Sequence, residues 1–289
     1  MISPTVKTQL IILLGTPLTH SVSPNMHNRV FESLDMDYYY LPVEVASEDL
    51  AVVFRGLAKM NVAGFNVTIP HKIEIMQYLD ELDPLAKTIG AVNTICFENG
   101  KTRGYNTDGE GFLKALEKKA AISVQGKRFF ILGCGGAVRA IAMTLAAKGV
   151  GAIYICNRTE EKASNLAAEI NEKIAPCAKS VPQITEDIKP ILQTCDVLVN
   201  GTQIGMHPDI DSSPIEKSLL TDNLIVSDIV YNPLKTKFLK DAQQQGCTTV
   251  DGLGMLIYQG AAAFHLWTGL APLIDEMSDT VYSLMSSSQ

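Results

Sequence analysis

The chain has 289 residues, of which 46% are hydrophobic and 19% charged, and a chain of this length is expected to form about two domains with sizeable cores. Its formal net charge is -7, and no run of Lys or Arg offsets it. This charge argues against nucleic acid and membrane surfaces as partners. The long apolar region between residues 129 and 156 is interrupted by glycines, Arg139 and Lys148. We therefore expect a soluble, cytoplasmic protein.

The cysteines and histidines show no metal-binding pattern. The six cysteines are scattered, with no C-x-x-C pair, and are interpreted as reduced core thiols. They are Cys96, Cys134, Cys156, Cys177, Cys195 and Cys247. The five histidines also lack metal-ligand spacing. No metal site is predicted.

The first third of the chain alternates between strand-like and helix-like segments. Strands are expected at residues 10–14, 38–43 and 63–68. One helix is expected to begin at Ser23 as its N-cap, with Pro24 in its first turn, and another to begin at Pro70. Asn99-Gly100 lies between two strand-like runs and predicts a hairpin.

The remainder of the chain predicts a second α/β region. Strands are expected at residues 128–132, 152–156, 196–200, 224–229 and 248–250, with helices or loops between them. Two helices, near residues 255–267 and 272–285, close the chain. The fold class is therefore α/β, with an N-terminal α/β domain, a boundary near Asp108 and a Rossmann-type dinucleotide-binding domain.

A glycine-rich segment between the strand at 128–132 and the following helix predicts the cofactor site. Its residues are Gly133, Cys134, Gly135, Gly136 and Ala137. Glycines let the backbone approach a pyrophosphate, and the helix N-terminus supplies N–H donors. The third position of the general fingerprint falls on Val138, so Gly136-Ala137 is expected to provide the close packing. The alternative is a tight turn that binds nothing.

The end of the next strand indicates which dinucleotide binds. NAD sites usually place a carboxylate there, whereas this chain has Asn157, Arg158 and Thr159, with Lys162 one turn later. Arg158 can make charge-assisted bonds to a 2′-phosphate, so NADP is the predicted cofactor. The alternative is Thr159 as a helix N-cap, with Arg158 on a solvated loop.

Several further motifs occur in a fixed order along the chain. They are His20–Asn28, Asn66–Lys72, Gly90–Thr94, Gly104–Gly109, Tyr231–Pro233, Asp251–Met255 and Tyr258–Ala261. Together they resemble the motifs of the shikimate dehydrogenase family, over most of the chain. The sequence departs from the family pattern at Cys134 and Gly201, where Ala is common, and at Lys162, where Arg is often found.

The resemblance implies two α/β domains around a cleft. Residues 1–107, completed by the helices at 254–289, would form the substrate-binding domain, and residues 108–253 the NADP-binding domain. The implied activity is the reversible NADPH-dependent reduction of 3-dehydroshikimate to shikimate in chorismate and aromatic amino acid biosynthesis. One alternative is a quinate/shikimate dehydrogenase that uses NAD or NADP. Another is a non-catalytic metabolite-binding module. A homodimer is compatible with the sequence.

The resemblance also implies roles for individual residues. Lys72 and Asp108 would form the catalytic pair. Ser21 and Ser23 would hold the substrate carboxylate, and Tyr231 would lie against the substrate. The ring hydroxyls would contact Thr68, Asn93, Asp108 and Gln259. The residues near the nicotinamide would be Ile229, Gly252 and Met255.

The residue types suit these roles. Hydride transfer to a ketone builds negative charge on oxygen, so a proton donor such as Lys72 must lie within hydrogen-bond reach. Ser21 and Ser23 would point the same way in an extended segment. Without the family pattern, Lys72 would be read as a solvated helix residue and Asp108 as an N-cap. His71, the neighbour of Lys72, is the second candidate proton donor.

Overall fold

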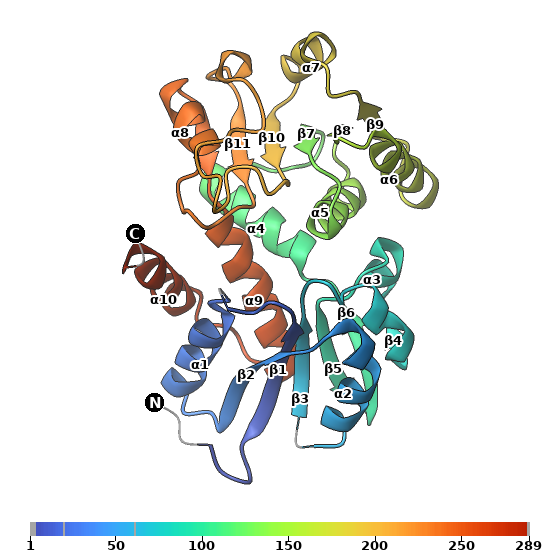
Figure 1. Cartoon of the computed structure of the whole chain (residues 1–289), viewed down its shortest axis with the longest axis vertical. Coiled ribbons are helices and arrows are strands. Elements are labelled where there is room, and N and C mark those ends of the chain that lie inside the picture. The colour runs from blue at the N-terminus through green and yellow to red at the C-terminus, as the bar shows by residue number, and fades with distance from the viewer. Residues whose placement is uncertain (1–3, 20, 61, 288–289) are drawn as a thin grey trace. The chain divides into compact units, whose positions relative to one another are not determined.

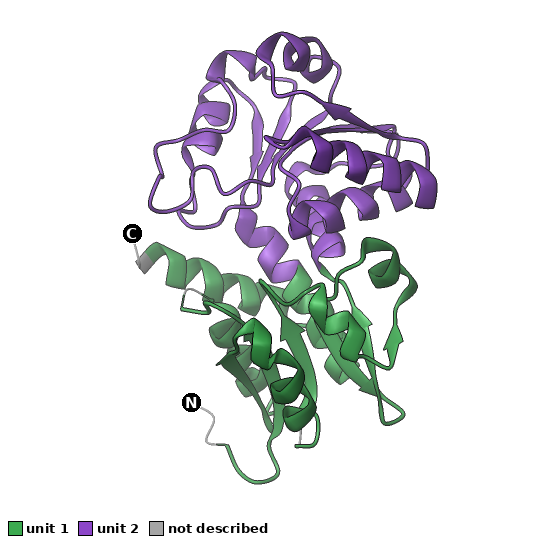
Figure 2. Cartoon of the chain, turned by 45° about the vertical axis from the view of Figure 1, so that its right-hand side comes forward, with its two compact units in different colours: residues 1–107, 259–288 green, residues 108–258, 289 purple. Residues whose placement is uncertain are grey.

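Two separate six-stranded sheets organise the chain (Figure 1). The computed structural model describes residues 4–19, 21–60 and 62–287. Contacts divide the chain into unit 1, Met1–Thr107 with Gln259–Ser288, and unit 2, which contains Asp108–Tyr258 (Figure 2). His20, which begins the first family motif, lies outside the described residues. The predicted α/β class is confirmed.

The sheet of unit 1 is mixed, with the order β2-β1-β3-β5-β6-β4. Its strands are β1 (Gln9–Gly15), β2 (Tyr38–Glu44), β3 (Val62–Val67), β4 (Glu81–Leu82), β5 (Thr94–Glu98) and β6 (Lys101–Tyr105). Strand β1 runs parallel to both β2 and β3, whereas β5 is antiparallel to β3 and β6. In the β5–β6 turn, Asn99 and Gly100 have φ angles of 52° and 77°. Positive φ at both positions is typical of a type I′ turn, so the predicted hairpin is confirmed.

The helices of unit 1 differ from the sequence-based expectation at two places. They are η1 (Ser47–Asp49), α2 (Leu50–Leu57), η2 (Glu74–Tyr78, a 3₁₀ helix), α3 (Pro84–Ile89), α10 (Ile274–Ser287) and α1 (Ser23–Ser33). Ser23 is the first helical residue, and Val22 is the N-cap without a side-chain cap, so the N-cap prediction for Ser23 is wrong. No α-helix begins at Pro70 either. A turn follows it, and i→i+3 bonding, as from Met76 N–H to Ile73 O (3.3 Å), tightens the chain into η2.

Helix α9 (Gly252–Thr268) begins in unit 2 and continues into unit 1. In unit 1 its Trp267 donates from Nε1 to Ile95 O at 3.1 Å. A Cβ atom on Gly64 would lie 2.3 Å from Cδ1 of this indole, so the ring packs where a side chain would otherwise stand. Helices α1 and α10 also pack together (Figure 1). The C-terminal segment therefore completes the core of unit 1.

His27 of α1 is buried in an aromatic cluster of unit 1. Its ring is fully buried and stacks on Tyr40, with centroids 4.7 Å apart. Among the described residues, neither ring nitrogen has a hydrogen-bond partner. Burial lowers the pKa of His27 from 6.5 to about 3, because the charged imidazolium would lose its hydration.

This buried imidazole predicts an acid-sensitive fold. Between about pH 6.5 and pH 3 the unfolded chain binds a proton at His27 that the folded chain does not, so the free energy of unfolding falls as pH falls. His27→Phe should reduce this dependence by up to about 1.4 kcal/mol per pH unit, as measured by urea unfolding from pH 7 to pH 5. Exposed His207→Gln is the control. Equal slopes for wild type and His27→Phe would contradict the prediction.

The sheet of unit 2 is entirely parallel, with the order β12-β11-β10-β7-β8-β9. Its strands are β7 (Arg128–Leu132), β8 (Ala152–Cys156), β9 (Ala178–Val181), β10 (Val197–Asn200), β11 (Ile225–Asp228) and β12 (Thr248–Val250). Its helices are α4 (Asp108–Ala120), α5 (Gly136–Ala147), α6 (Glu160–Lys173), α7 (Thr185–Leu192), η3 (Lys217–Leu219) and α8 (Lys237–Gln244). The order reverses between β7 and β10, where a doubly wound sheet binds its ligand beyond the carboxyl ends of the strands.

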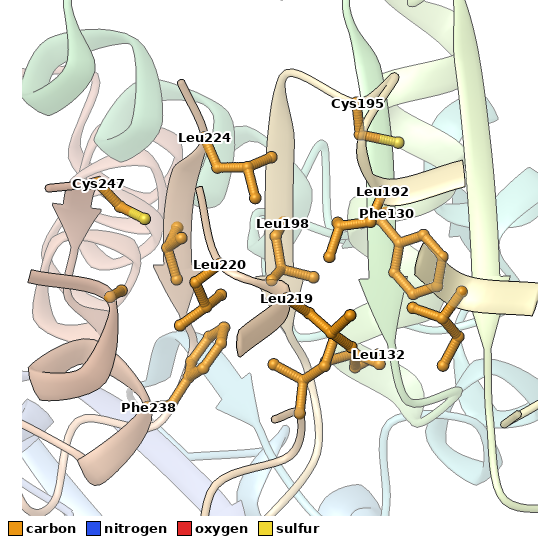
Figure 3. Packing of buried hydrophobic residues seen from close by; sticks show 14 of the residues in the cluster. Phe130, Leu132, Leu192, Cys195, Leu198, Leu219, Leu220, Leu224, Phe238 and Cys247 are labelled. Carbon is orange, nitrogen blue, oxygen red and sulfur yellow. The ribbon is translucent and has the colours of Figure 1, made fainter. Parts of the chain in front are cut away.

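Apolar side chains on one side of this sheet form a continuous core (Figure 3). Phe130 and Leu198 from the central strands pack with Phe238 of α8 and Leu192 of α7. Four cysteines are buried, as predicted, but Cys134 and Cys177 are only partly buried, so the interpretation of these two residues as core thiols is wrong.

None of the helices in the described residues has both the length and the apolarity that a membrane span requires.

Candidate active site

The turn after β3 carries Thr68 and Lys72 in unit 1. The Thr68 N–H donates to Leu14 O at 2.9 Å. Gly15 makes room for the threonine methyl group, because a Cβ there would lie 2.3 Å from Thr68 Cγ2. The backbone of Lys72 is fixed by Val92, whose N–H donates to Lys72 O at 2.8 Å. The sheet therefore anchors the turn, and the Lys72 side chain is half-buried.

His71 is fixed beneath the same turn. Its ring is fully buried, and Nε2 lies 2.8 Å from Val45 O. A carbonyl oxygen can only accept, so Nε2 carries the proton and donates it to this bond. This arrangement argues against His71 as the second candidate proton donor and favours Lys72.

A buried hydrogen-bond network brings three predicted regions of unit 1 together. Asn93 Nδ2 donates to Thr107 Oγ1 at 2.9 Å and lies 3.4 Å from Gln259 Oε1. Asn93 Oδ1 accepts from Thr107 N–H at 2.9 Å. Asn66 Nδ2 donates to Asn93 O at 2.9 Å. Neutral donors and acceptors held in this way suit the recognition of hydroxyl groups.

Ser23 joins this network through Tyr40. The Tyr40 hydroxyl donates to Asn66 Oδ1 at 2.8 Å and also hydrogen-bonds the Ser23 side chain. Burial raises the pKa of Tyr40, so its phenol stays neutral. Ser21 precedes the helix, with its N–H donating to Leu18 O at 3.0 Å. The extended segment expected for Ser21 and Ser23 is wrong, because Val22 has helical backbone angles.

Asp108 opens α4 in unit 2 and is buried. The next residue, Gly109, allows α4 to approach α5 closely. A Cβ on Gly109 would lie 2.0 Å from Thr144 Oγ1 and 2.7 Å from the backbone oxygen of Ala140. The position of the Asp108 turn therefore depends on Gly109, the last residue of the Gly104–Gly109 motif.

A cavity of about 410 Å³ lies beyond the carboxyl ends of the strands in unit 2. Its lining includes Leu132, Gly133, Cys156, Asn157, Arg158, Gln183, Thr202, Gln203, Ile204, Asp209 and Pro214. Three predicted cofactor residues, Gly133, Asn157 and Arg158, are thus brought together in it. Thr159 and Lys162 are outside its lining and exposed. The other predicted loop residues, Cys134, Gly135, Gly136 and Ala137, are also outside its lining. Thr159 is the N-cap of α6 but makes no side-chain cap.

The glycine loop has the open backbone that a dinucleotide phosphate requires. Cβ atoms on Gly135 and Gly136 would meet nothing within 4 Å, and Gly133 has a φ of 101°. The loop leads into the N-terminus of α5. The first N–H groups of a helix have no intrahelical acceptor, so they can donate hydrogen bonds to a phosphate. Cys134 Sγ contacts Lys162 O at 3.2 Å. Burial raises the pKa of Cys134, which keeps the thiol neutral.

The close packing of this loop comes from an unexpected position. A Cβ on Gly136 would meet nothing within 4 Å, so the expectation that Gly136-Ala137 provides the close packing is wrong. Instead, a Cβ on Gly201 would lie 2.0 Å from Cγ2 of buried Val138. The two departures from the general patterns are therefore complementary, since the larger side chain at 138 is accommodated by the missing one at 201.

This complementarity can be tested with a double-mutant cycle on the free energy of unfolding. Gly201→Ala alone should destabilise the fold by about 1–3 kcal/mol through overpacking. Val138→Ala alone should also destabilise it, by leaving a cavity. The double variant should lose less than the sum, with a coupling of about 0.5–3 kcal/mol. Strict additivity of the two losses would show that the residues do not compete for space.

The predicted nicotinamide residues follow β11 and begin α9. A Cβ on Gly252 would lie 2.6 Å from Ile229 O, so these two backbones touch. Tyr231 is half-buried, and burial raises the pKa of its phenol. Met255 is half-buried on α9. Asp228, at the end of β11, is 1% exposed, and burial raises its pKa from 3.8 to about 6 against three hydrogen bonds that lower it.

Among the described residues, no group of His, Cys, Asp and Glu could hold a metal ion.

Several polar residues beside these sites were not predicted from the sequence. The missed residues are Tyr40, Asn66, Thr107, Gln183, Asn200, Asp209 and Asp228. A polar residue at a buried strand position, as at Asn66 and Asn200, is the signal that could have revealed part of this set.

Comparisons with known proteins agree with this geometry. Family models for the shikimate dehydrogenase substrate binding domain, shikimate / quinate 5-dehydrogenase and the shikimate 5′-dehydrogenase C-terminal domain match residues 13–95, 115–251 and 252–282. A shikimate dehydrogenase (NADP(+)) from Bacillus cereus is 46% identical over 94% of this chain and 97% of its own length.

Solved structures give the same result. A shikimate dehydrogenase in complex with NADP+ is 44% identical, with a TM-score of 0.91 and 98% of each chain covered. A shikimate 5-dehydrogenase from Listeria monocytogenes, in complex with shikimate and NAD, is 38% identical, with a TM-score of 0.92, covering 97% of this chain and 99% of its own. This chain belongs to the shikimate dehydrogenase family.

Proposed function

We propose that this chain catalyses the reversible NADPH-dependent reduction of 3-dehydroshikimate to shikimate, a step of chorismate and aromatic amino acid biosynthesis. The observation that carries the proposal is similarity, over nearly the whole chain, to curated NADP(+) shikimate dehydrogenases. The cavity in unit 2 that Gly133, Asn157 and Arg158 line together supports it. In this proposal unit 1 binds the substrate and unit 2 binds the cofactor.

Lys72 and Asp108 are the proposed catalytic residues. NADPH, when bound, supplies the hydride that reduces the substrate ketone. Lys72 Nζ donates a proton to the forming alkoxide and takes it back in the reverse direction. The carboxylate of Asp108 orients the ammonium and binds a ring hydroxyl. The anchored backbone of Lys72 supports this role, since a proton donor needs a fixed position.

The proposed substrate contacts are mostly neutral and polar. They are Ser21, Ser23, Thr68, Lys72, Asn93, Asp108, Tyr231 and Gln259. Two serine hydroxyls near a helix N-terminus suit a carboxylate. The hydrogen bonds that Asn93 makes to Thr107 and Gln259 support a site preorganised for hydroxyl groups.

The proposed cofactor contacts fall into three groups. Gly133, Cys134, Gly135, Gly136 and Ala137 bind the pyrophosphate. Asn157, Arg158, Thr159 and Lys162 bind the 2′-phosphate end. Ile229, Gly252 and Met255 face the nicotinamide. The open glycine loop and the lining of the cavity support the first two groups.

Arg158 should set the preference for NADP. A charge-assisted hydrogen bond contributes roughly 1.5–3 kcal/mol, or about ten- to a hundredfold in affinity. Arg158→Ala should weaken NADP+ binding by that factor and leave NAD+ binding nearly unchanged, as measured by calorimetry. Exposed Lys179→Ala is the control for loss of a positive charge. Equal losses for both cofactors would refute the assignment.

Initial rates on purified protein test the function itself. Shikimate and quinate should each be measured with NADP+ and NAD+, and shikimate with NADP+ should give the highest kcat/KM. Quinate carries one extra hydroxyl, which a hydrophobic wall rejects only modestly. Comparable turnover of quinate would support the quinate/shikimate alternative. Binding of shikimate without turnover would support the non-catalytic module.

The location and assembly of the protein form part of the same proposal. All six cysteines are free thiols, which suits a reducing cytoplasm. A homodimer is tested by sedimentation of the purified chain, and a single species of monomer mass would refute it. Neither nucleic acid nor membrane is proposed as a partner, in keeping with the net charge of -7.

A further inference from the structure

Two buried polar residues end neighbouring strands in unit 2. Asn200 is the last residue of β10 and Asp228 the last of β11, and the two are register partners in the parallel sheet. Asn200 is 0% exposed and Asp228 is 1% exposed. Burying a carboxylate costs free energy unless hydrogen bonds replace its lost hydration. The hydrogen-bond partners of Asp228 therefore indicate which parts of the chain it holds in place.

Asn200 fixes the loop that lines the cofactor cavity. Its Oδ1 accepts from the N–H and the Oγ1 of Thr202, at 3.0 and 2.7 Å. Its Nδ2 donates to Ile204 O at 3.3 Å. Thr202 and Ile204 both line the cavity that contains Arg158.

Asp228 fixes the loop on the proposed nicotinamide side. Its Oδ1 accepts from Val230 N–H at 3.0 Å, and its Oδ2 accepts from Thr236 Oγ1 at 2.6 Å. These bonds hold the segment 229–236 near its start, at Val230, and at its end, at Thr236. This segment contains Ile229 and Tyr231.

One hydrogen bond joins the two loops. The second N–H of Asn200 Nδ2 donates to Asp228 Oδ1 at 2.9 Å. The backbone adds a parallel link, since Ile229 N–H donates to Asn200 O at 3.0 Å. Both N–H groups of the amide are thereby used, and each side chain bonds its own loop and the other residue.

We propose that Asn200 and Asp228 are positioning residues that align the loop at the adenosine half of the cofactor with the loop at its nicotinamide half. The inference rests on the proposed function. Neither residue touches a reacting atom. They act through Thr202 and Ile204 on one side and through Val230, which follows Ile229, on the other, so that the dinucleotide binds at both halves in one register. A displacement of about 1 Å at a reacting centre can cost a hundredfold in rate.

The test separates the two halves with a cofactor fragment. Adenosine 2′,5′-bisphosphate contains the adenosine half and no nicotinamide. Asp228→Ala should leave calorimetric binding of this fragment unchanged within about twofold, while kcat for shikimate falls at least about tenfold. Asn200→Ala should weaken fragment binding as well as kcat, because it releases Thr202 and Ile204.

A conservative variant and a control guard against simple loss of folding. Asp228→Asn keeps an acceptor for Asn200 and Val230 and should recover most of the lost kcat. Ser227→Ala, buried on the same strand, should leave both readouts unchanged. Should Asp228→Ala fail to fold, Asn200→Ala alone still decides, because it must weaken the fragment and lower kcat together.

The proposal is overturned if folded variants keep kcat within twofold while losing only thermal stability. It is also overturned if Asp228→Ala weakens the fragment as much as Asn200→Ala does. Failure of the proposed function is distinguishable, since wild-type protein would then not oxidise shikimate at all. The fragment-binding comparison of the two variants would still be readable in that case.

Discussion

Replacing Lys72 with alanine should lower kcat by at least about a hundredfold while changing the affinity for shikimate little. General acid–base groups contribute about 10²–10⁴ in rate, equivalent to roughly 3–5 kcal/mol of barrier. Proton donation to the forming alkoxide occurs chiefly in the transition state, so its loss appears in kcat rather than in KM. The neighbouring imidazole of His71 donates to Val45 O and should not replace it.

A double-mutant cycle on kcat, with calorimetric binding of shikimate, measures this effect. Asp108→Asn should lower kcat less but raise KM, because Asp108 is also proposed to bind a ring hydroxyl. The two losses should be less than additive, since the residues act as a unit. Exposed Lys87→Ala is the matched control in unit 1. If Lys72→Ala keeps its kcat and loses only affinity, Lys72 is a binding residue and another donor is required.

Replacing Gly109 with alanine should cost both stability and activity. The added Cβ would lie 2.7 Å from the Ala140 carbonyl oxygen, so α4 must move away from α5. Overpacking of this kind costs about 1–3 kcal/mol and more where backbone is involved. The same movement displaces the first turn of α4, which carries Asp108. A shift of about 1 Å there should lower kcat on the order of a hundredfold.

Urea unfolding and initial rates on the folded protein measure the two effects. Gly56→Ala is the matched control, because it lies within α2 and its Cβ would meet nothing within 4 Å. That substitution should stabilise the protein by roughly 0.5–1 kcal/mol through helix propensity. Wild-type stability and kcat in Gly109→Ala would show that α4 and α5 are not held as closely as the structure indicates.

Local sequence pattern predicts the regular parts of this fold. The strands β7 and β8 coincide with apolar runs bounded by turn residues, and the β5–β6 hairpin forms at Asn99-Gly100. Strand β9 escapes prediction because only four residues form it and two of them are polar, Lys179 and Ser180. The turn after Pro70 resembles an α-helix in sequence, because proline favours the first turn of a helix but does not determine whether the next residues continue it.

Long-range packing explains most of what sequence could not predict at the site. Gly201 and Val138 are far apart in the chain, and nothing local to either reveals that one accommodates the other. The same is true of Asn66 and Tyr40, which meet only because β1 lies between β2 and β3. The family motifs identified single residues, whereas the hydrogen bonds that hold them depend on sheet order.

The return of the C-terminal segment to unit 1 has a consequence for synthesis on the ribosome. Trp267 fills the space above Gly64 and bonds Ile95 O, so the core of unit 1 stays open until α9 is made. The ribosome must first produce the whole of unit 2, which at about 5–20 residues per second takes roughly 8–30 s. During that interval the β1–β3 surface is an exposed apolar face. We expect chaperones to protect the nascent N-terminal half, and unit 2 to fold before it.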